Sequence, residues 1–301
     1  MRAAALRKLF SLAQNDPRIL LAVSDVAAEI LAPFKENMPQ RLFVEGIAEN
    51  HLVGMAAGLS KKNNVVFINT IASFLSKRAF EAIAVNLCLE NANVKMLAQG
   101  GGLVYGEQGS THHALEDISI MRSLPNMTVI APCDTHQTEQ AVELATKILG
   151  PVYIRLSKGS FPVISSSHTL AVGEPICFSK PGRIAFISTG ITTQTALEAS
   201  ALFPESGVIN IPILKPFPEQ KVLALINSCE LVVTIEEHSP IGGLSSCLAS
   251  ILAAHSRRPR LLSISLKDDF VRDYGKQEEL LKLHGLDTES VVRRVRENLR
   301  A

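Results

Sequence analysis

Hydrophobic residues in the first half of the chain gather in short, nearly continuous runs, and the segments between them have the length and spacing of helices. The apolar runs lie at residues 19–25, 65–72, 94–102, 127–134 and 151–157. Such runs are typical of strands in a parallel sheet, because helices cover both faces of that kind of sheet. The helical segments lie at residues 3–14, 77–91, 114–123 and 135–149. This alternation predicts an α/β fold with a parallel sheet.

Polar and small residues follow the apolar runs, where the strands would have their carboxyl ends. They are Ser24 and Asp25, Asn69 to Phe74, Gln99 to Gly102, Pro132 to Asp134, and Ser157 to Gly159. In parallel sheets the loops at this edge carry binding and catalytic groups. The pattern therefore predicts that these residues converge on one site.

The second half of the chain repeats the alternation on a smaller scale. Residues 160–182 contain three consecutive serines and several prolines and have no helical period, so we expect the connection between two domains at residues 164–182. The first domain is predicted at residues 1–163. The second is predicted at residues 183–301, with about five strands and a charged helical segment at 276–299.

The composition fits a two-domain protein with a large core. The chain has 301 residues, of which 47% are hydrophobic and 20% charged, and single cores rarely grow beyond about 250–300 residues. The net charge is +1 with both signs interspersed, so we expect no nucleic-acid or membrane partner. Five scattered cysteines without a C-x-x-C pair favour reduced thiols in the cytoplasm over disulfides or a zinc site. No apolar run approaches the ~18 residues of a membrane span.

Residues 41–59 hold the most unusual polar position in the chain. A short apolar run and a turn at Gly46 precede a segment rich in alanine and glycine, and Glu49 falls at the start of this predicted helix. Two interpretations are open. Glu49 is either a surface residue favoured by the positive end of the helix dipole, or a carboxylate kept for chemistry, since burying an unpaired charge costs several kcal/mol.

Several sequence blocks in a fixed order resemble one known family over nearly the whole chain. Besides the Glu49 stretch they are SFLSKRAFEAI at 73–83, GEQGSTHHALEDI at 106–118, RSLPNMTVIAPCD at 122–134, GPVYIRLSKG at 150–159, VTIEEH at 233–238 and GGL at 242–244. These blocks resemble the pyrimidine-binding domain and the C-terminal domain of transketolases. The resemblance implies a parallel-sheet pyrimidine-binding domain, a smaller α/β C-terminal domain, and thiamine diphosphate as cofactor.

The same resemblance implies roles for individual residues. Glu49 matches the catalytic glutamate that hydrogen-bonds the pyrimidine ring and promotes its reactive tautomer. Phe74 and Phe80 match aromatic positions around that ring, and Asp25 is expected at the cofactor site. His112 matches a histidine that binds and polarises substrate oxygens, a role suited to an imidazole; capping the following helix is the alternative.

The substrate-binding positions depart from the family pattern. Gln108 replaces an aspartate that contacts sugar hydroxyls but still offers hydrogen bonds, and Gly100 replaces a histidine, so we expect open space there. The cation after the last strand of the domain is Lys158 where the family has arginine. Together with Arg155 it is expected to bind the anionic end of the substrate. His113 replaces the usual glutamine and is expected to face outward.

The chain contains no G-D-G sequence, which transketolases use, with a downstream asparagine, to bind magnesium and the diphosphate. The resemblance therefore implies the C-terminal subunit of a split transketolase, which transfers a two-carbon ketol unit from a ketose donor to an aldose acceptor. A partner subunit with the diphosphate-binding domain would supply the ligands of the diphosphate and Mg²⁺, so no metal ligand is expected here. Self-association through the helix at 47–59, together with the partner subunits, would give a heterotetramer.

Other functions stay open on the sequence alone. They are the beta subunit of a 2-oxoacid dehydrogenase, part of a deoxyxylulose-phosphate-synthase-like enzyme, and a non-catalytic assembly subunit. The retained Glu49 and His112 favour an enzyme, whereas Gly100 and Gln108 favour a loss of activity. The sequence does not identify the sugar or sugar phosphate.

Overall fold

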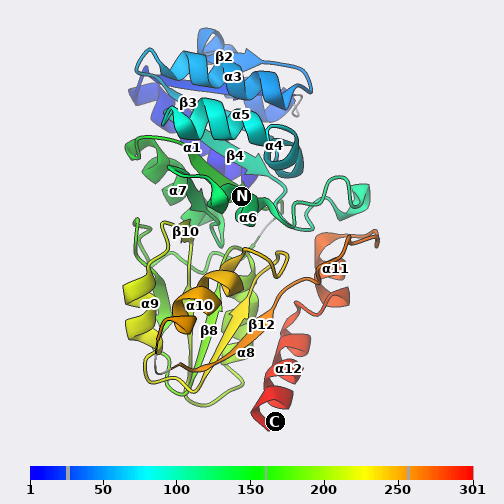
Figure 1. Cartoon of the computed structure of the whole chain (residues 1–301). Helices are drawn as coiled ribbons and strands as arrows, with labels where there is room; N and C mark the ends of the chain where they lie inside the picture. Colours follow the sequence, from blue (N-terminus) through cyan, green and yellow to red (C-terminus); the bar gives the residue numbers. More distant parts are fainter. Residues whose placement is uncertain (25–27, 160, 256–257, 301) are drawn as a thin grey trace.

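Two α/β units lie end to end in the structure, the first coloured blue to green and the second mostly yellow to red (Figure 1). This computed structural model describes residues 1–24, 28–159, 161–255 and 258–300. The predicted α/β class is confirmed. Within the described ranges, no helix has the length and apolar character needed to cross a membrane.

The first sheet has seven strands in the order β10-β5-β6-β4-β3-β1-β2. Their bounds are β1 (Ile19–Val23), β2 (Leu42–Val44), β3 (Val65–Ile71), β4 (Val94–Gln99), β5 (Thr128–Ile130), β6 (Val152–Leu156) and β10 (Ile213–Lys215). All neighbouring strands run parallel except β10, which is antiparallel to β5. Every residue of β1, β4 and β6 is buried, which explains why these strands are mainly apolar in sequence.

Helices cover both faces of the first sheet. The helices on one face are α1 (Arg2–Asn15), α2 (Ala32–Asn37) and α7 (Thr135–Lys147). Those on the other face are α3 (Glu49–Ser60), α4 (Ala72–Arg78), α5 (Phe80–Ala82) and α6 (Asp117–Ser123), with the π-helical turn η3 (Ile83–Leu89). Alternate residues of β1 enter the two cores, Leu20 and Ala22 on one side and Leu21 on the other, as the two-residue period of a strand requires. The short turns are η1 (Ala28–Leu31), η2 (Pro39–Arg41) and η4 (Gly106–Gln108).

The second sheet has five strands in the order β12-β11-β8-β9-β7. Their bounds are β7 (Ile176–Ser179), β8 (Ile184–Ser188), β9 (Ser206–Asn210), β11 (Leu231–Ile235) and β12 (Arg260–Ile264). One face packs against α9 (Glu219–Ile226) and α10 (Leu244–Ala253). The other packs against α8 (Thr192–Ser200) and α12 (Thr288–Arg300), with α11 (Gln277–Leu283) nearby.

Two strands depart from the expected domain pattern. β7 lies inside residues 164–182, where only a connection was expected, and pairs antiparallel with β9. β10 belongs to the second half of the chain but joins the first sheet. Pro212 separates it from β9 because proline has no N–H to continue the ladder, and the Pro212 carbonyl accepts the N–H of Ala131 at 2.8 Å. The two halves of the chain are therefore joined through a shared sheet edge.

Candidate functional site

The carboxyl ends of β1, β3 and β4 bring polar side chains together, as the sequence predicted. The hydroxyls of Ser24 and Thr70 are 2.6 Å apart, and the amide of Gln99 donates to Asn69. Asn69 Nδ2 and the Ser73 hydroxyl are buried and have no partner within the described part of the chain. Buried polar groups normally find a partner, so this edge keeps free hydrogen-bonding capacity.

Glu49 is the first residue of α3 and only 1% of it is exposed. Arg78, at the end of α4, donates from Nη1 to Glu49 Oε2 at 2.7 Å, and half of the Arg78 side chain is exposed. The burial excludes a surface role for Glu49. Its charge is nevertheless paired, by an arginine that the sequence reasoning did not single out. The sequence did contain a signal for this pairing, because Arg78 is a cation one helical turn after Phe74.

A hollow beside this ion pair has aromatic and cationic walls. It measures about 590 Å³ and is lined by Ser73, Phe74, Lys77, Arg78, Ser110, Thr111 and Phe270. The guanidinium carbon of Arg78 lies 4.9 Å from the centre of the Phe74 ring. The His112 ring stands edge-on to Phe74, with 5.0 Å between their centres. Phe74 lines the hollow itself. Glu49 and His112 do not line it, but each contacts a residue that does, Glu49 through Arg78 and His112 through Phe74.

Two residues predicted to bind cofactor are not placed at this hollow. Phe80 begins α5 and packs against the hydrophobic core of the first domain. Ala79 interrupts the helix with φ −100° and ψ 14°, so Phe80 does not continue the face that carries Phe74. Its contact with the cofactor ring stays a prediction. Asp25 lies outside the described residues.

The two neighbouring histidines have different surroundings. His112 is partly exposed, and its Nδ1 lies 3.0 Å from the Thr111 hydroxyl. His113 is only 2% exposed, so the prediction that it faces outward is wrong. Burial lowers the pKa of His113 and keeps its ring neutral. The ring turns inward just before Ala114, which pairs with Gly102 through the backbone.

The Tyr105 ring lies beside two of the predicted substrate-binding positions, Gly100 and Lys158. A Cβ on Gly100 would collide with the Tyr105 ring, so the expectation of open space there is wrong. Lys158 Nζ lies 5.9 Å from the centre of the same ring, and the His112 ring centre lies 6.3 Å from it. Lys158 and His112 therefore flank one aromatic ring, whereas Gln108 is exposed on η4.

Arg155 is buried in the interior and does not reach the hollow. Its Nε lies 2.9 Å from Asp117 Oδ2, and its Nη2 donates to the carbonyls of Ala114 and Glu237 at 3.0 and 2.9 Å. The Tyr153 hydroxyl donates to the same carboxylate at 2.8 Å. The predicted substrate contact is wrong, because the guanidinium is already used to fix a loop and to join the two domains.

The second domain holds the loop after β4, a role that the sequence did not predict. Glu237 Oε1 accepts the N–H of Leu103 at 2.9 Å, and burial raises the pKa of Glu237. Farther along the loop, the Ser110 hydroxyl donates to the carbonyl of Val271. The preceding residue, Phe270, lines the hollow. Glu237 belongs to the VTIEEH block at residues 233–238, and this block was the sequence signal that could have drawn attention to it.

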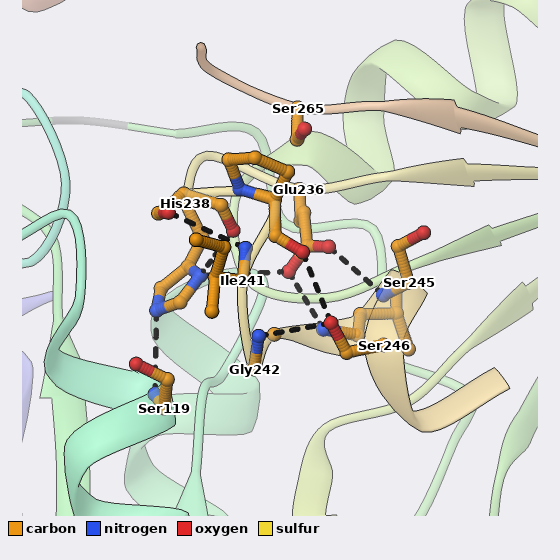
Figure 2. A network of polar contacts seen from close by, with 12 residues as sticks. Ser119, Glu236, His238, Ile241, Gly242, Ser245, Ser246 and Ser265 are labelled. Carbon is orange, nitrogen blue, oxygen red and sulfur yellow. Dashed lines mark hydrogen bonds and ion pairs between the residues drawn. The ribbon is translucent and has the colours of Figure 1, made fainter. Parts of the chain in front are cut away.

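A second buried network fixes the junction between the domains (Figure 2). The Glu236 carboxylate accepts the first two backbone N–H groups of α10 at 2.7 and 2.9 Å, and burial raises its pKa to about 7. His238 Nε2 accepts the N–H of Ser119 in α6 at 3.3 Å, and its Nδ1 lies 2.7 Å from the Ser239 carbonyl. Burial lowers the pKa of His238 to about 4, so a neutral ring donates from Nδ1 and accepts at Nε2.

The hollow fits the pyrimidine ring of thiamine diphosphate in size and chemistry. Phe74 offers a flat face, the Ser73 hydroxyl is free to bond, and the buried Glu49 carboxylate lies behind Arg78. Aromatic faces and a few convergent polar groups are typical of sites for flat heteroaromatic ligands. Among the described residues, no cluster of three or more His, Cys, Asp or Glu side chains is arranged to hold a metal ion.

Comparison with known proteins assigns both halves of the chain. The family model for the transketolase pyrimidine binding domain matches residues 1–163, and the model for the transketolase C-terminal domain matches residues 179–291. An apulose-4-phosphate transketolase subunit of Actinobacillus succinogenes is 32% identical over 95% of this chain and 94% of its own length. A 6-deoxy-6-sulfo-D-fructose transketolase subunit of Clostridium sp. is 32% identical over 96% of this chain and 91% of its own length.

Structural comparison agrees with these matches. A solved structure described as "Split gene transketolase, inactive beta4 tetramer" has a TM-score of 0.88 and 34% identity, over 98% of this chain and 96% of that one. The 1-deoxy-D-xylulose-5-phosphate synthase of Syntrophus aciditrophicus is 30% identical over 96% of this chain, but over only 45% of the synthase. The chain belongs to the transketolase family and resembles, over nearly its whole length, the C-terminal subunits of split transketolases.

Proposed function

We propose that the chain is the C-terminal subunit of a thiamine-diphosphate-dependent split transketolase that moves a two-carbon ketol unit from a ketose to an aldose. The observation that carries this proposal is a chain of contacts at the hollow that Phe74 and Arg78 line. The buried Glu49 pairs with Arg78, and His112 packs on Phe74. The relatives named as transketolase subunits, which align over nearly their full lengths, support it. The lower coverage of the synthase makes a deoxyxylulose-phosphate-synthase activity the weaker alternative.

Four residues in and around the hollow each have a task in this proposal. When bound, the cofactor supplies the electron sink for breaking a carbon–carbon bond beside a carbonyl. Glu49 hydrogen-bonds the pyrimidine ring and carries the proton there, while Phe74 supports the flat face of the ring. His112 binds the substrate oxygen next to the reacting carbon, and Lys158 attracts the anionic end of the substrate.

A partner subunit completes the site in our proposal. It carries the diphosphate-binding domain and supplies the ligands of the diphosphate and Mg²⁺. This chain also self-associates, and the complex is a heterotetramer. The exposed side of α3 supports this, because Gly54 and Gly58 lie on it and permit close approach of another helix. The description of the split-gene relative as a beta4 tetramer further supports self-association.

The isolated chain is expected to bind thiamine diphosphate at least roughly 100-fold more weakly than the complex does, or about 2.7 kcal/mol. The reason is that diphosphate and Mg²⁺ contribute much of the affinity, and their ligands lie on the partner. Calorimetry with Mg²⁺ present would measure the binding, and sedimentation of the same samples would report self-association. Tight binding by this chain alone, or a stable monomer at micromolar concentration, would contradict the proposal.

Co-expression with a partner that carries G-D-G and a downstream asparagine tests the function directly. The purified complex should transfer a ketol unit in a screen of ketose donors and aldose acceptors. Oxidative decarboxylation of 2-oxoacids in its place would identify a dehydrogenase-type subunit. Condensation of pyruvate with glyceraldehyde 3-phosphate would identify the synthase-type reaction. A complex that forms but catalyses none of these would indicate an assembly role.

The reconstituted complex is expected to use xylulose 5-phosphate and ribose 5-phosphate poorly. The proposal assigns the anionic end of the substrate to Lys158, whose Nζ lies 5.9 Å from the centre of the Tyr105 ring. The Arg155 guanidinium is bound to Asp117. Tyr105 occupies the space beside Gly100, and Gln108 is neutral. The relatives are named for other sugars, apulose 4-phosphate and 6-deoxy-6-sulfo-D-fructose. We therefore expect kcat/KM below ~10⁴ M⁻¹s⁻¹ for the common pair, and a higher value would overturn this specificity.

A further inference from the structure

Arg78 stands between the two groups that a cofactor ring would contact. Its guanidinium donates to the buried Glu49 at 2.7 Å and lies 4.9 Å from the centre of the Phe74 ring. A guanidinium is flat, has hydrogen-bond donors in its plane, and stacks on aromatic rings. An aminopyrimidine also has a flat face and an in-plane amino donor, and its ring nitrogen becomes a second donor when it takes up a proton. The arginine and the ring would therefore compete for the same carboxylate and the same aromatic face.

The two partners of this ion pair differ in their freedom to move. Glu49 is buried and held at the first position of α3. Arg78 is the last residue of α4, and half of its side chain is exposed at the hollow. A half-exposed guanidinium can be hydrated when it leaves its partner, whereas the buried carboxylate cannot be, so it needs a replacement donor. Movement of Arg78 is thus the low-cost way to uncover Glu49.

We propose that Arg78 is an internal competitor of the cofactor's pyrimidine ring, which pairs with Glu49 and covers Phe74 until the ring displaces it. This inference rests on the proposed function and goes beyond it. In the chain without cofactor, Arg78 compensates the buried charge of Glu49. The apparent affinity for the ring is lowered in proportion to the fraction of molecules in which Arg78 has moved away.

The neighbouring Lys77 offers a matched control. It follows Phe74 on the same helix, lines the same hollow and carries the same charge. Its Nζ pairs with Glu116 at 3.0 Å, however, and not with Glu49. Loss of positive charge from the hollow is therefore common to Lys77→Gln and Arg78→Gln. Only Arg78→Gln removes the group that occupies the ring's place.

Calorimetric titration of the full chain with 4-amino-5-hydroxymethyl-2-methylpyrimidine, the ring half of thiamine, tests the proposal without the diphosphate. Arg78→Gln is expected to bind this ring about tenfold more tightly than the wild type, because a charge-assisted hydrogen bond and a cation–π contact no longer have to be broken. Lys77→Gln should stay within about twofold of the wild type. Equal or weaker binding by Arg78→Gln, or no binding by either protein, would overturn the proposal.

A measurement on the wild type guards against a variant that fails to fold. In nitrogen-15 NMR spectra of the arginine side chains, the guanidinium of Arg78 should give a signal typical of a carboxylate-bound group. Saturating ring should convert it to the spectrum of a free, hydrated arginine, and an unchanged signal at saturation would overturn the competition. Neither readout needs turnover. Absence of ketol transfer in the reconstituted complex would refute the proposed function and leave the result for Arg78 standing.

Discussion

Replacement of Glu49 by glutamine is expected to lower kcat of the reconstituted complex by at least about 100-fold, the scale of losing a positioned acid–base group. Glutamine has nearly the same volume and still accepts a hydrogen bond from Arg78, but it has no ionisable carboxyl group. Water cannot take over that task, because only 1% of Glu49 is exposed. The half-exposed Arg78 can be hydrated after losing its partner, so we expect the fold to survive.

A neighbouring glutamate provides the control for this experiment. Glu45 lies four residues before Glu49, is partly exposed, and its Oε2 is 3.6 Å from His51 Nε2. Glu45→Gln should keep near-normal turnover, and both variants should melt within a few degrees of the wild type. Near-normal kcat for Glu49→Gln in the same preparation would mean that a different carboxylate acts on the ring.

The central elements were predictable from the sequence because their burial leaves a simple pattern. β1, β4 and β6 are buried at every residue, so each is mainly apolar, with Lys95 and Gln99 in β4 and Arg155 in β6 as the exceptions. The antiparallel edge strands β7 and β10 were not predictable in this way. They have four and three residues, and a strand that short is defined by a partner distant in sequence, β9 or β5.

The candidate site shows a similar division. Resemblance in ordered blocks predicted that Glu49, Phe74 and His112 share one site, because block order preserves the loops at the carboxyl ends of the strands. In the structure, Arg78 and Phe74 link the three by direct contacts, and their roles stay predictions. The type of a residue does not tell where its side chain points or which group it contacts. Arg155 was therefore misinterpreted as a free cation, and the pairing of Arg78 with Glu49 was missed.

Replacement of Asp117 by alanine is expected to destabilise the protein by about 3–5 kcal/mol, the usual cost of breaking a buried ion pair from one side. Asp117 is fully buried, and its Oδ2 accepts hydrogen bonds from Nε of Arg155 at 2.9 Å and from the hydroxyl of Tyr153 at 2.8 Å. The variant would leave a buried guanidinium without its counter-charge and a buried hydroxyl without its acceptor. Urea denaturation followed by circular dichroism would measure the change in the free energy of unfolding.

Two further variants test whether the predicted loss of stability comes from the burial of the ion pair and from the cation left without a partner. Arg183→Met removes an ion pair with Glu230 that is exposed on both sides, so it should leave the free energy of unfolding nearly unchanged. Adding Arg155→Met to Asp117→Ala removes the unpaired cation, so the double variant should lose less stability than the sum of the single variants. If Asp117→Ala cost no more than Arg183→Met, water would have to reach Arg155. The guanidinium could then serve as the substrate-binding cation that its sequence position first indicated.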